Sequence, residues 1–124
     1  MKRLISLTFL LAVAPASALD VLPYDAQSFS RAQNEGRLTA VQFHSGWCPV
    51  CVMQERGVRA LNGERAFDKL VVFQADYFKE EGLRKHLGVS SFSTLVIFRG
   101  HQERARTTGD FRPEQLRPLF ARAL

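Results

Sequence analysis

Apolar residues along this chain follow two spacings, and each spacing predicts a different element. Short apolar runs are typical of strands, whereas apolar residues three and four positions apart are typical of helices. The predicted strands cover residues 38–44, 70–75, 94–98 and 103–108. The predicted helices begin near Asp25, cover residues 49–61 and 80–87, and begin again near Pro113. This alternation favours an α/β domain with a parallel core, an antiparallel edge and helices on both faces of the sheet.

The helix predicted at residues 49–61 starts with a proline. Pro49 suits the first helical turn, where its missing N–H group costs nothing. The expected buried face consists of Met53, Gly57, Ala60 and Leu61, which lie at helical spacing. Met53 is therefore expected in the core, and Gly57 is expected to weaken or bend the helix.

The first residues have the pattern of a secretory signal. Lys2 and Arg3 precede an apolar run at residues 4–13, and the small residues Ala16-Ser17-Ala18 form a cleavage pattern. The apolar run is too short to cross a membrane, which takes about 20 residues. We therefore expect cleavage after Ala18. The remaining residues 19–124 would form one exported domain, periplasmic or secreted, monomeric and without membrane insertion.

Charge excludes one class of partner. The chain has 17 Lys and Arg against 12 Asp and Glu, a net charge of +5, and part of this excess lies in the leader. The remaining basic residues are spread along the chain without a block of like charges. This distribution favours a solvated surface over nucleic-acid binding.

The chain has two cysteines, Cys48 and Cys51, and their spacing favours chemistry over structure. An exported compartment allows disulfides to persist. A bridge between these residues closes almost no loop, so it would stabilise the fold little. Cys48 follows a predicted strand and begins a predicted helix, where free N–H groups and the helix dipole lower a thiol's pKa. We therefore expect Cys48 to attack and Cys51, one turn further, to resolve the mixed disulfide.

A metal site is the alternative interpretation of the same cysteines. A structural zinc site usually needs four ligands, and the sequence has no second cysteine pair. His44 and Met53 could join Cys48 and Cys51 as soft ligands of Cu(I), in a module for metalloenzyme assembly. A third interpretation is an interaction domain with an inert disulfide.

Two segments resemble the thioredoxin family. Residues 43–51, FHSGWCPVC, resemble its active-site segment, and residues 88–100, GVSSFSTLVIFRG, are similar to its cis-proline loop and the next strand. Residues 71–76 resemble the intervening strand. The resemblance implies a thioredoxin fold: a central mixed sheet of four to five strands with helices on both faces. It also implies thiol–disulfide exchange with dithiols and disulfides of partner proteins, without a cofactor.

The resemblance further indicates which residues support the cysteines and meet a partner. These residues are Trp47, Pro49, Val50, Phe92, Ser93 and Thr94. The pair between the cysteines carries no charge and no side-chain donor, which favours a reductant over an oxidase. A membrane-bound electron donor would then supply the electrons.

Three positions depart from the family pattern. Ser93 occupies the cis-proline position, which leaves open whether the Phe92–Ser93 peptide bond is cis or trans. Gln42 replaces a buried acidic residue and Gln74 replaces a lysine on the neighbouring strand. Gln42 cannot relay a proton from the resolving thiol as a carboxylate does, so water or another group must do so.

Overall fold

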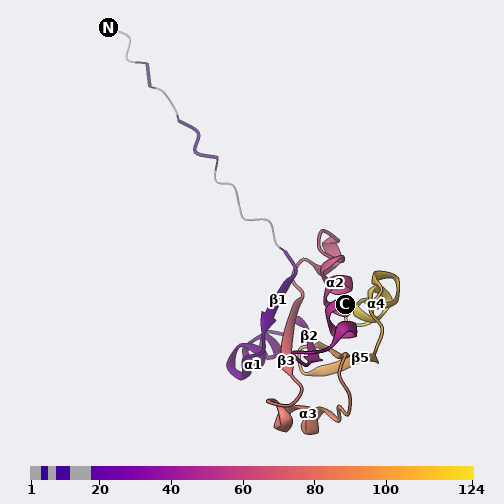
Figure 1. Cartoon of the computed structure of the whole chain (residues 1–124). Coiled ribbons are helices and arrows are strands. Elements are labelled where there is room, and N and C mark those ends of the chain that lie inside the picture. The colour runs from indigo at the N-terminus through magenta and orange to yellow at the C-terminus, as the bar shows by residue number, and fades with distance from the viewer. Residues whose placement is uncertain (1–3, 6–7, 12–17) are drawn as a thin grey trace.

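The computed structural model describes residues 4–5, 8–11 and 18–124, and the folded domain lies in the last of these ranges (Figure 1). Most of the predicted signal segment falls outside the described residues, so the signal and its cleavage site stay predictions. Within the described ranges, no helix combines the length and apolar character that a membrane span requires.

Five strands form one mixed sheet in the order β1-β3-β2-β4-β5. The strands are β1 (Asp20–Pro23), β2 (Leu38–His44), β3 (Val71–Asp76), β4 (Thr94–Arg99) and β5 (Gln102–Thr108). β1, β3 and β2 are parallel, whereas β4 runs antiparallel to β2, and β5 antiparallel to β4. The expected parallel core with an antiparallel edge is therefore confirmed.

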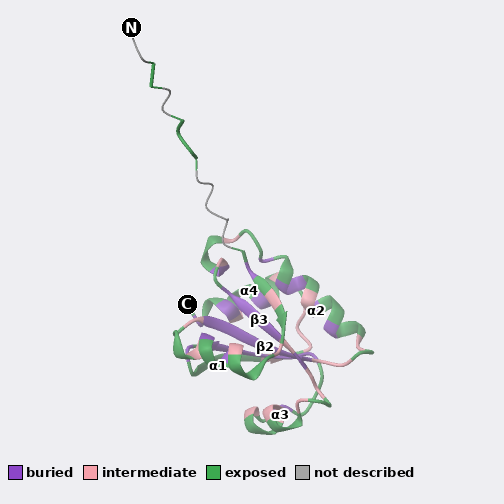
Figure 2. Ribbon diagram, turned by 90° about the vertical axis from the view of Figure 1, so that its left-hand side faces the viewer, coloured by how far each residue is buried: buried purple, intermediate pink, exposed green. Residues whose placement is uncertain are grey.

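Helices cover both faces of this sheet (Figure 1). They are α1 (Ala26–Asn34), α2 (Pro49–Arg59), α3 (Glu81–Leu87) and α4 (Pro113–Ala121), with a short 3-10 turn at Arg65–Phe67. Apolar residues of α2 and α4 pack on one face of the sheet, and those of α1 and α3 pack on the other. Figure 2 shows the central strands buried between these layers, with the outer helix surfaces exposed.

The expected elements are present, and β1 is the strand that the sequence pattern missed. β1 is four residues long, mostly exposed, and ends at Pro23, which has no N–H group to donate. It pairs with β3 alone among the described strands, so it needs no continuous apolar run. Its pairing places Tyr24 against β3, where the Tyr24 backbone N–H donates to the Gln74 carbonyl at 2.8 Å.

The expected buried face of α2 was partly wrong. Met53 is 37% exposed, and Ala60 is also exposed. Gly57 and Leu61 are buried as expected, and Cys51, Gln54 and Val58 are buried with them in place of Met53 and Ala60. A polar residue, Gln54, lies on this buried face. The apolar pattern alone therefore placed Met53 on the buried face, although its neighbour Gln54 is the buried residue.

Five connections meet at one end of the sheet. The parallel strands β1, β2 and β3 end there, β4 begins there, and β5 ends there because Thr108 pairs with Thr94. In α/β sheets, ligands bind at the carboxyl ends of the parallel strands. The loops that follow His44, Asp76 and Thr108 and the loop that precedes Thr94 therefore form the candidate site.

Gly57 yields a prediction about stability. A Cβ atom at Gly57 would collide with the carbonyl oxygen of Phe111 and would lie 3.1 Å from Cδ1 of Leu116. Replacement by alanine forces α2 and the α4 connection apart, so Gly57→Ala should lower the free energy of unfolding by about 1–3 kcal/mol. Urea unfolding of the disulfide-bonded protein measures this.

Gly82 in α3 is the matched control. A Cβ atom there has no neighbour within 4 Å, and alanine favours a helix over glycine by about 0.5–1 kcal/mol. Gly82→Ala should therefore keep or raise the free energy of unfolding. Equal effects of the two substitutions would show that the close approach at Gly57 does not limit packing.

Candidate active site

Cys48 and Cys51 form a disulfide at the start of α2. Cys48 is the N-cap residue, and its sulfur accepts the backbone N–H of Cys51 at 3.2 Å. Pro49 takes the first helical position, as expected. Cys48 is partly exposed, whereas Cys51 is 4% exposed. One sulfur is therefore open to a partner, and the other lies behind it, which is the arrangement that an attacking and a resolving thiol need.

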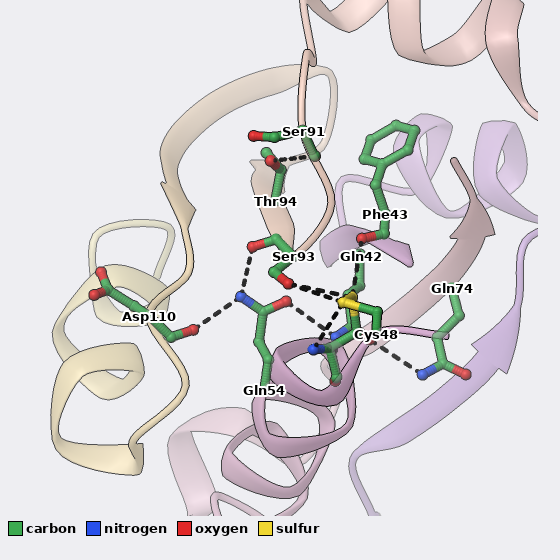
Figure 3. Close-up of a disulfide and its surroundings, with 10 residues drawn as sticks. Gln42, Phe43, Cys48, Gln54, Gln74, Ser91, Ser93, Thr94 and Asp110 are labelled. Carbon is green, nitrogen blue, oxygen red and sulfur yellow. Dashed lines mark hydrogen bonds between the residues drawn. A yellow bond between two sulfur atoms is a disulfide. The ribbon is translucent and has the colours of Figure 1, made fainter. Parts of the chain in front are cut away.

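Ser93 contacts the disulfide from the loop before β4, whereas both cysteines lie at the start of α2 (Figure 3). Its hydroxyl oxygen lies 3.4 Å from the sulfur of Cys48 and 3.2 Å from the sulfur of Cys51. Ser93 is 5% exposed, and it lies just before β4. The Ser93 hydroxyl, on the loop that resembles the cis-proline loop of the family, thus contacts both sulfurs.

The backbone at Ser93 differs from that of a cis-proline loop. The Phe92–Ser93 peptide bond is trans, because none of the described peptide bonds is cis, and Ser93 has a φ of 58°. Proline fixes φ near −65°, so it cannot adopt this left-handed conformation. The substitution by serine therefore goes with a different loop geometry as well as a different side chain.

Three glutamines, of which Gln42 and Gln54 are buried and Gln74 is half-buried, form a chain of hydrogen bonds next to the disulfide (Figure 3). The Gln74 side-chain N–H group donates to Gln42 at 3.1 Å. Gln42 donates to the carbonyl of Cys51 at 3.1 Å and to the side-chain oxygen of Gln54 at 3.0 Å. Gln42 and Gln74 face each other in the strand register, and so the two departures from the family pattern pair with one another.

Gln54 is a site residue that the sequence analysis missed. Its side-chain N–H group donates to the carbonyls of Ser93 and Asp110, both at 2.8 Å. It is fully buried and lies three positions after Cys51 on the same helix face. A polar residue at that spacing from the inner cysteine was the available signal, because it must be buried with the cysteine and needs partners.

Aromatic side chains pack together on the turn after β3 and on the loop that leads to Ser93. Tyr77, Phe78 and Phe92 pack edge to face, with ring centroids 4.8–5.5 Å apart, and we call these three residues the aromatic surface. Phe78 is 67% exposed, and Phe92 directly precedes Ser93. Trp47, which directly precedes Cys48, is 86% exposed. Apolar contact area is therefore available on the segment that carries the disulfide and on the loop whose Ser93 contacts it.

The turn after β3 holds the aromatic surface in place. The Asp76 carboxylate accepts the backbone N–H groups of Phe78 and Lys79, both at 2.9 Å, and these bonds lower its pKa. The Arg84 guanidinium lies over the Tyr77 ring, 4.3 Å from its centroid, and donates to the Tyr77 carbonyl. Phe78 is thus exposed on a fixed turn.

The other expected site residues have different surroundings. Pro49 and Val50 are exposed beside Cys48. Thr94 is buried, and its hydroxyl bonds the carbonyl of Ser91 and the hydroxyl of Thr108, so it supports the loop rather than meeting a partner. Val50 and Pro49 therefore extend the exposed area around the outer sulfur.

The residues of the metal alternative do not form a cluster in the described structure. The described residues contain no group of three or more His, Cys, Asp or Glu side chains that could hold a metal ion. Met53 lines a shallow hollow with Phe111 and Pro113 on the α4 side of α2. His44 ends β2 opposite Asp76. The Cu(I) interpretation of these four residues stays a prediction.

Comparisons with known proteins agree with this architecture. The Thioredoxin family model matches residues 20–121. A protein disulfide-isomerase from Aspergillus niger is 30% identical over 81 residues. That match spans 65% of this chain but only 16% of the length of the isomerase.

Solved structures share the fold. The protein Trxlp from Edwardsiella tarda is 33% identical with a TM-score of 0.75, and the alignment covers 81% of this chain and 97% of that one. A thioredoxin from Malassezia sympodialis has a TM-score of 0.70 over 90% of this chain and 95% of its own, and at 18% identity it shows the fold alone. The sheet order, the disulfide at the start of α2 and the family match over residues 20–121 agree, and the chain therefore belongs to the thioredoxin family.

Proposed function

We propose that this chain is a thiol–disulfide oxidoreductase that reduces disulfides of partner proteins. The observation that carries the proposal is the Cys48–Cys51 disulfide, which has one accessible and one buried sulfur at a helix amino end. A helix amino end stabilises a thiolate on the outer sulfur, because unpaired N–H groups and the helix dipole favour negative charge. Thiolates are the reactive form in disulfide exchange.

The reaction consists of two exchanges at sulfur. The Cys48 thiolate attacks a partner disulfide, so a Cys48–partner bond forms and the partner's other sulfur leaves with the electron pair. Cys51 then loses its proton and attacks the Cys48 sulfur, which forms the Cys48–Cys51 disulfide and releases the second partner sulfur. The cysteine pair loses two electrons and the proton of Cys51, and the partner gains the two electrons and takes up two protons, one of them from water.

The exposed aromatic residues support a protein as the partner. Phe78 and Trp47 present large apolar side chains to solvent near the disulfide, on the turn after β3 and on the segment before α2. Aromatic residues are enriched where proteins bind one another. A polypeptide with a cysteine between apolar residues would cover this area while its sulfur meets Cys48.

The proposal also covers the direction of electron transfer and the compartment in which the protein acts. The uncharged Pro49-Val50 pair supports a reductant, and a reductant outside the cytoplasm needs an electron source, for which we propose a membrane-bound dithiol donor. The basic, apolar and small-residue pattern of residues 1–18 supports export to the periplasm or beyond. The exported domain would act as a monomer.

Trapping variants test the roles of the two cysteines. Cys51→Ser should accumulate mixed disulfides with partner proteins, because Cys48 still attacks but nothing resolves the bond. Cys48→Ser should accumulate none, because the remaining sulfur is buried. Non-reducing gels of cells that express each variant with its own amino terminus measure this.

The double variant, with both cysteines replaced, is the control for nonspecific bands. Equal trapping by the two single variants would contradict the assignment of attacking and resolving cysteine, and no trapping by either would favour the inert disulfide.

The same cells test export. A purified chain that begins at Leu19 supports a cleaved signal, whereas a chain that keeps residues 1–18 in the cytoplasm contradicts it.

The reduction potential tests the direction. We expect a value closer to the thioredoxin figure of about −270 mV than to the disulfide-isomerase figure of about −180 mV, because the dipeptide adds no charge to stabilise the thiolate. Equilibration of the protein with glutathione buffers measures the potential. A value at or above the isomerase figure would identify an oxidant or isomerase instead.

Phe78 tests the aromatic surface. Phe78→Ser should lower kcat/KM for a protein disulfide such as that of insulin by about fivefold, because truncation of an interface aromatic residue removes about 1 kcal/mol or more of binding. The rate with hydroxyethyl disulfide, which is too small to reach Phe78 and Cys48 together, should not change.

Leu124→Ser is the matched control for Phe78→Ser. Leu124 is 60% exposed, and it lies beside Leu38 and Leu70, at the opposite end of the sheet from the disulfide. This substitution should leave both rates unchanged. Equal loss with both variants, or no loss with Phe78→Ser, would exclude the aromatic surface from partner binding.

A further inference from the structure

The Ser93 hydroxyl is the polar side-chain group that contacts the disulfide. Its oxygen lies 3.4 Å from the sulfur of Cys48 and 3.2 Å from the sulfur of Cys51 (Figure 3). The other polar neighbours of the sulfurs are backbone groups: the N–H of Cys51, which donates to the Cys48 sulfur, and the carbonyl of Phe43, 4.0 Å from the Cys51 sulfur, which can accept from it only when Cys51 is a thiol. Within the described chain, no titratable side chain hydrogen-bonds to either sulfur.

The backbone of Ser93 is fixed on three sides. Its N–H group donates to the carbonyl of Phe43 at 2.9 Å. Its carbonyl accepts the side chain of Gln54 at 2.8 Å and the N–H group of Gly109 at 3.0 Å. These bonds tie it to β2, to α2 and to the loop after β5. The backbone of Ser93 is therefore held beside the two sulfurs, and only its short side chain is left to rotate.

The conformation of Ser93 also singles it out. A φ of 58° is uncommon for a residue other than glycine, and such conformations cluster at functional sites. Glycine would adopt this conformation more readily than serine. The backbone conformation alone would therefore favour glycine at this position. Compared with glycine, serine adds a hydroxyl group beside the sulfurs.

We propose that Ser93 is a catalytic residue, whose hydroxyl donates a hydrogen bond to whichever sulfur of the Cys48–Cys51 pair carries the negative charge. The inference rests on the proposed thiol–disulfide exchange. In the dithiol form, the hydroxyl donates to the Cys48 thiolate, and its oxygen accepts the S–H group of Cys51. A hydrogen bond to a charged acceptor is about twice as strong as one between neutral groups.

The same hydroxyl can stabilise a thiolate in both steps by which a donor dithiol reduces the Cys48–Cys51 disulfide. When a donor dithiol reduces the protein, a donor thiolate attacks the Cys48 sulfur, and the Cys48–Cys51 bond breaks with its electron pair on Cys51. The hydroxyl, 3.2 Å away, stabilises this thiolate until it takes up a proton. The donor's second thiolate then attacks the donor sulfur bound to Cys48. Cys48 leaves as the thiolate, 3.4 Å from the hydroxyl, and the donor ends as a disulfide.

Two substitutions that both remove the hydroxyl test the proposal. Ser93→Ala keeps a Cβ atom at positive φ, whereas Ser93→Gly relieves that conformation. Both should lower the thiolate absorbance of the reduced protein at neutral pH. Both should also shift the equilibrium with glutathione toward the disulfide by about tenfold, which corresponds to about 30 mV. The two variants should shift together although their stabilities differ.

Ser91→Ala is the matched control, because Ser91 lies in the same loop with an exposed side chain. It should leave the thiolate absorbance and the equilibrium unchanged. Unchanged values in both Ser93 variants would overturn the proposal, and so would shifts that follow stability and differ between alanine and glycine. If wild-type protein fails to reduce protein disulfides, the proposed function fails instead, whatever the variants do.

Discussion

A chain of amide hydrogen bonds, buried at Gln42 and Gln54, holds the site and the sheet in one arrangement. It runs from Gln74 on β3 through Gln42 on β2 to Gln54 on α2, which binds the carbonyls of Ser93 and Asp110. Gln42 and Gln54 are buried, and a buried amide without a partner costs about 1–3 kcal/mol, so the hydrogen bonds of these two side chains depend on one another. They fix α2, the loop before β4 and the loop after β5 relative to one another. The position of the disulfide against Ser93 follows from that constraint.

The chain of amides is also neutral. Amide groups do not ionise, so the charge of the side chains around Cys48 and Cys51 stays the same when either reduced cysteine gains or loses a proton. A carboxylate at Gln42 would have taken up the proton of the resolving thiol and would have changed charge in doing so. Here the side-chain group at hydrogen-bond distance from the sulfurs is the Ser93 hydroxyl. Charge in this site is therefore stabilised by a hydrogen bond and a helix end rather than by an opposite charge.

The sequence indicated most of the fold because strong local patterns coincide with buried elements. The bounds of β2 were predicted correctly, since a run that holds the apolar residues Leu38, Val41 and Phe43 ends at the turn-prone Ser45-Gly46. β1 was missed because an exposed edge strand of four residues carries no such run. In the site, the cysteines were evident from spacing alone, whereas the partners of Gln54 come from β4 and β5 connections far along the chain. Met53 was misplaced because an apolar pattern cannot indicate that a helix buries a glutamine instead.

The two sides of the disulfide show why so little of the site follows from local sequence. On the inner side, positions are fixed by bonds between residues 39–56 positions apart, so neither the trans peptide before Ser93 nor its positive φ can be inferred from neighbours. On the outer side, Phe78 and Trp47 are exposed, although exposure of large apolar residues is unfavourable in water. The hydrogen bonds that hold Ser93 against the sulfurs and the aromatic side chains that we propose to meet a partner belong to different residues. Under the proposed function, recognition and chemistry would therefore depend on different positions of the sequence.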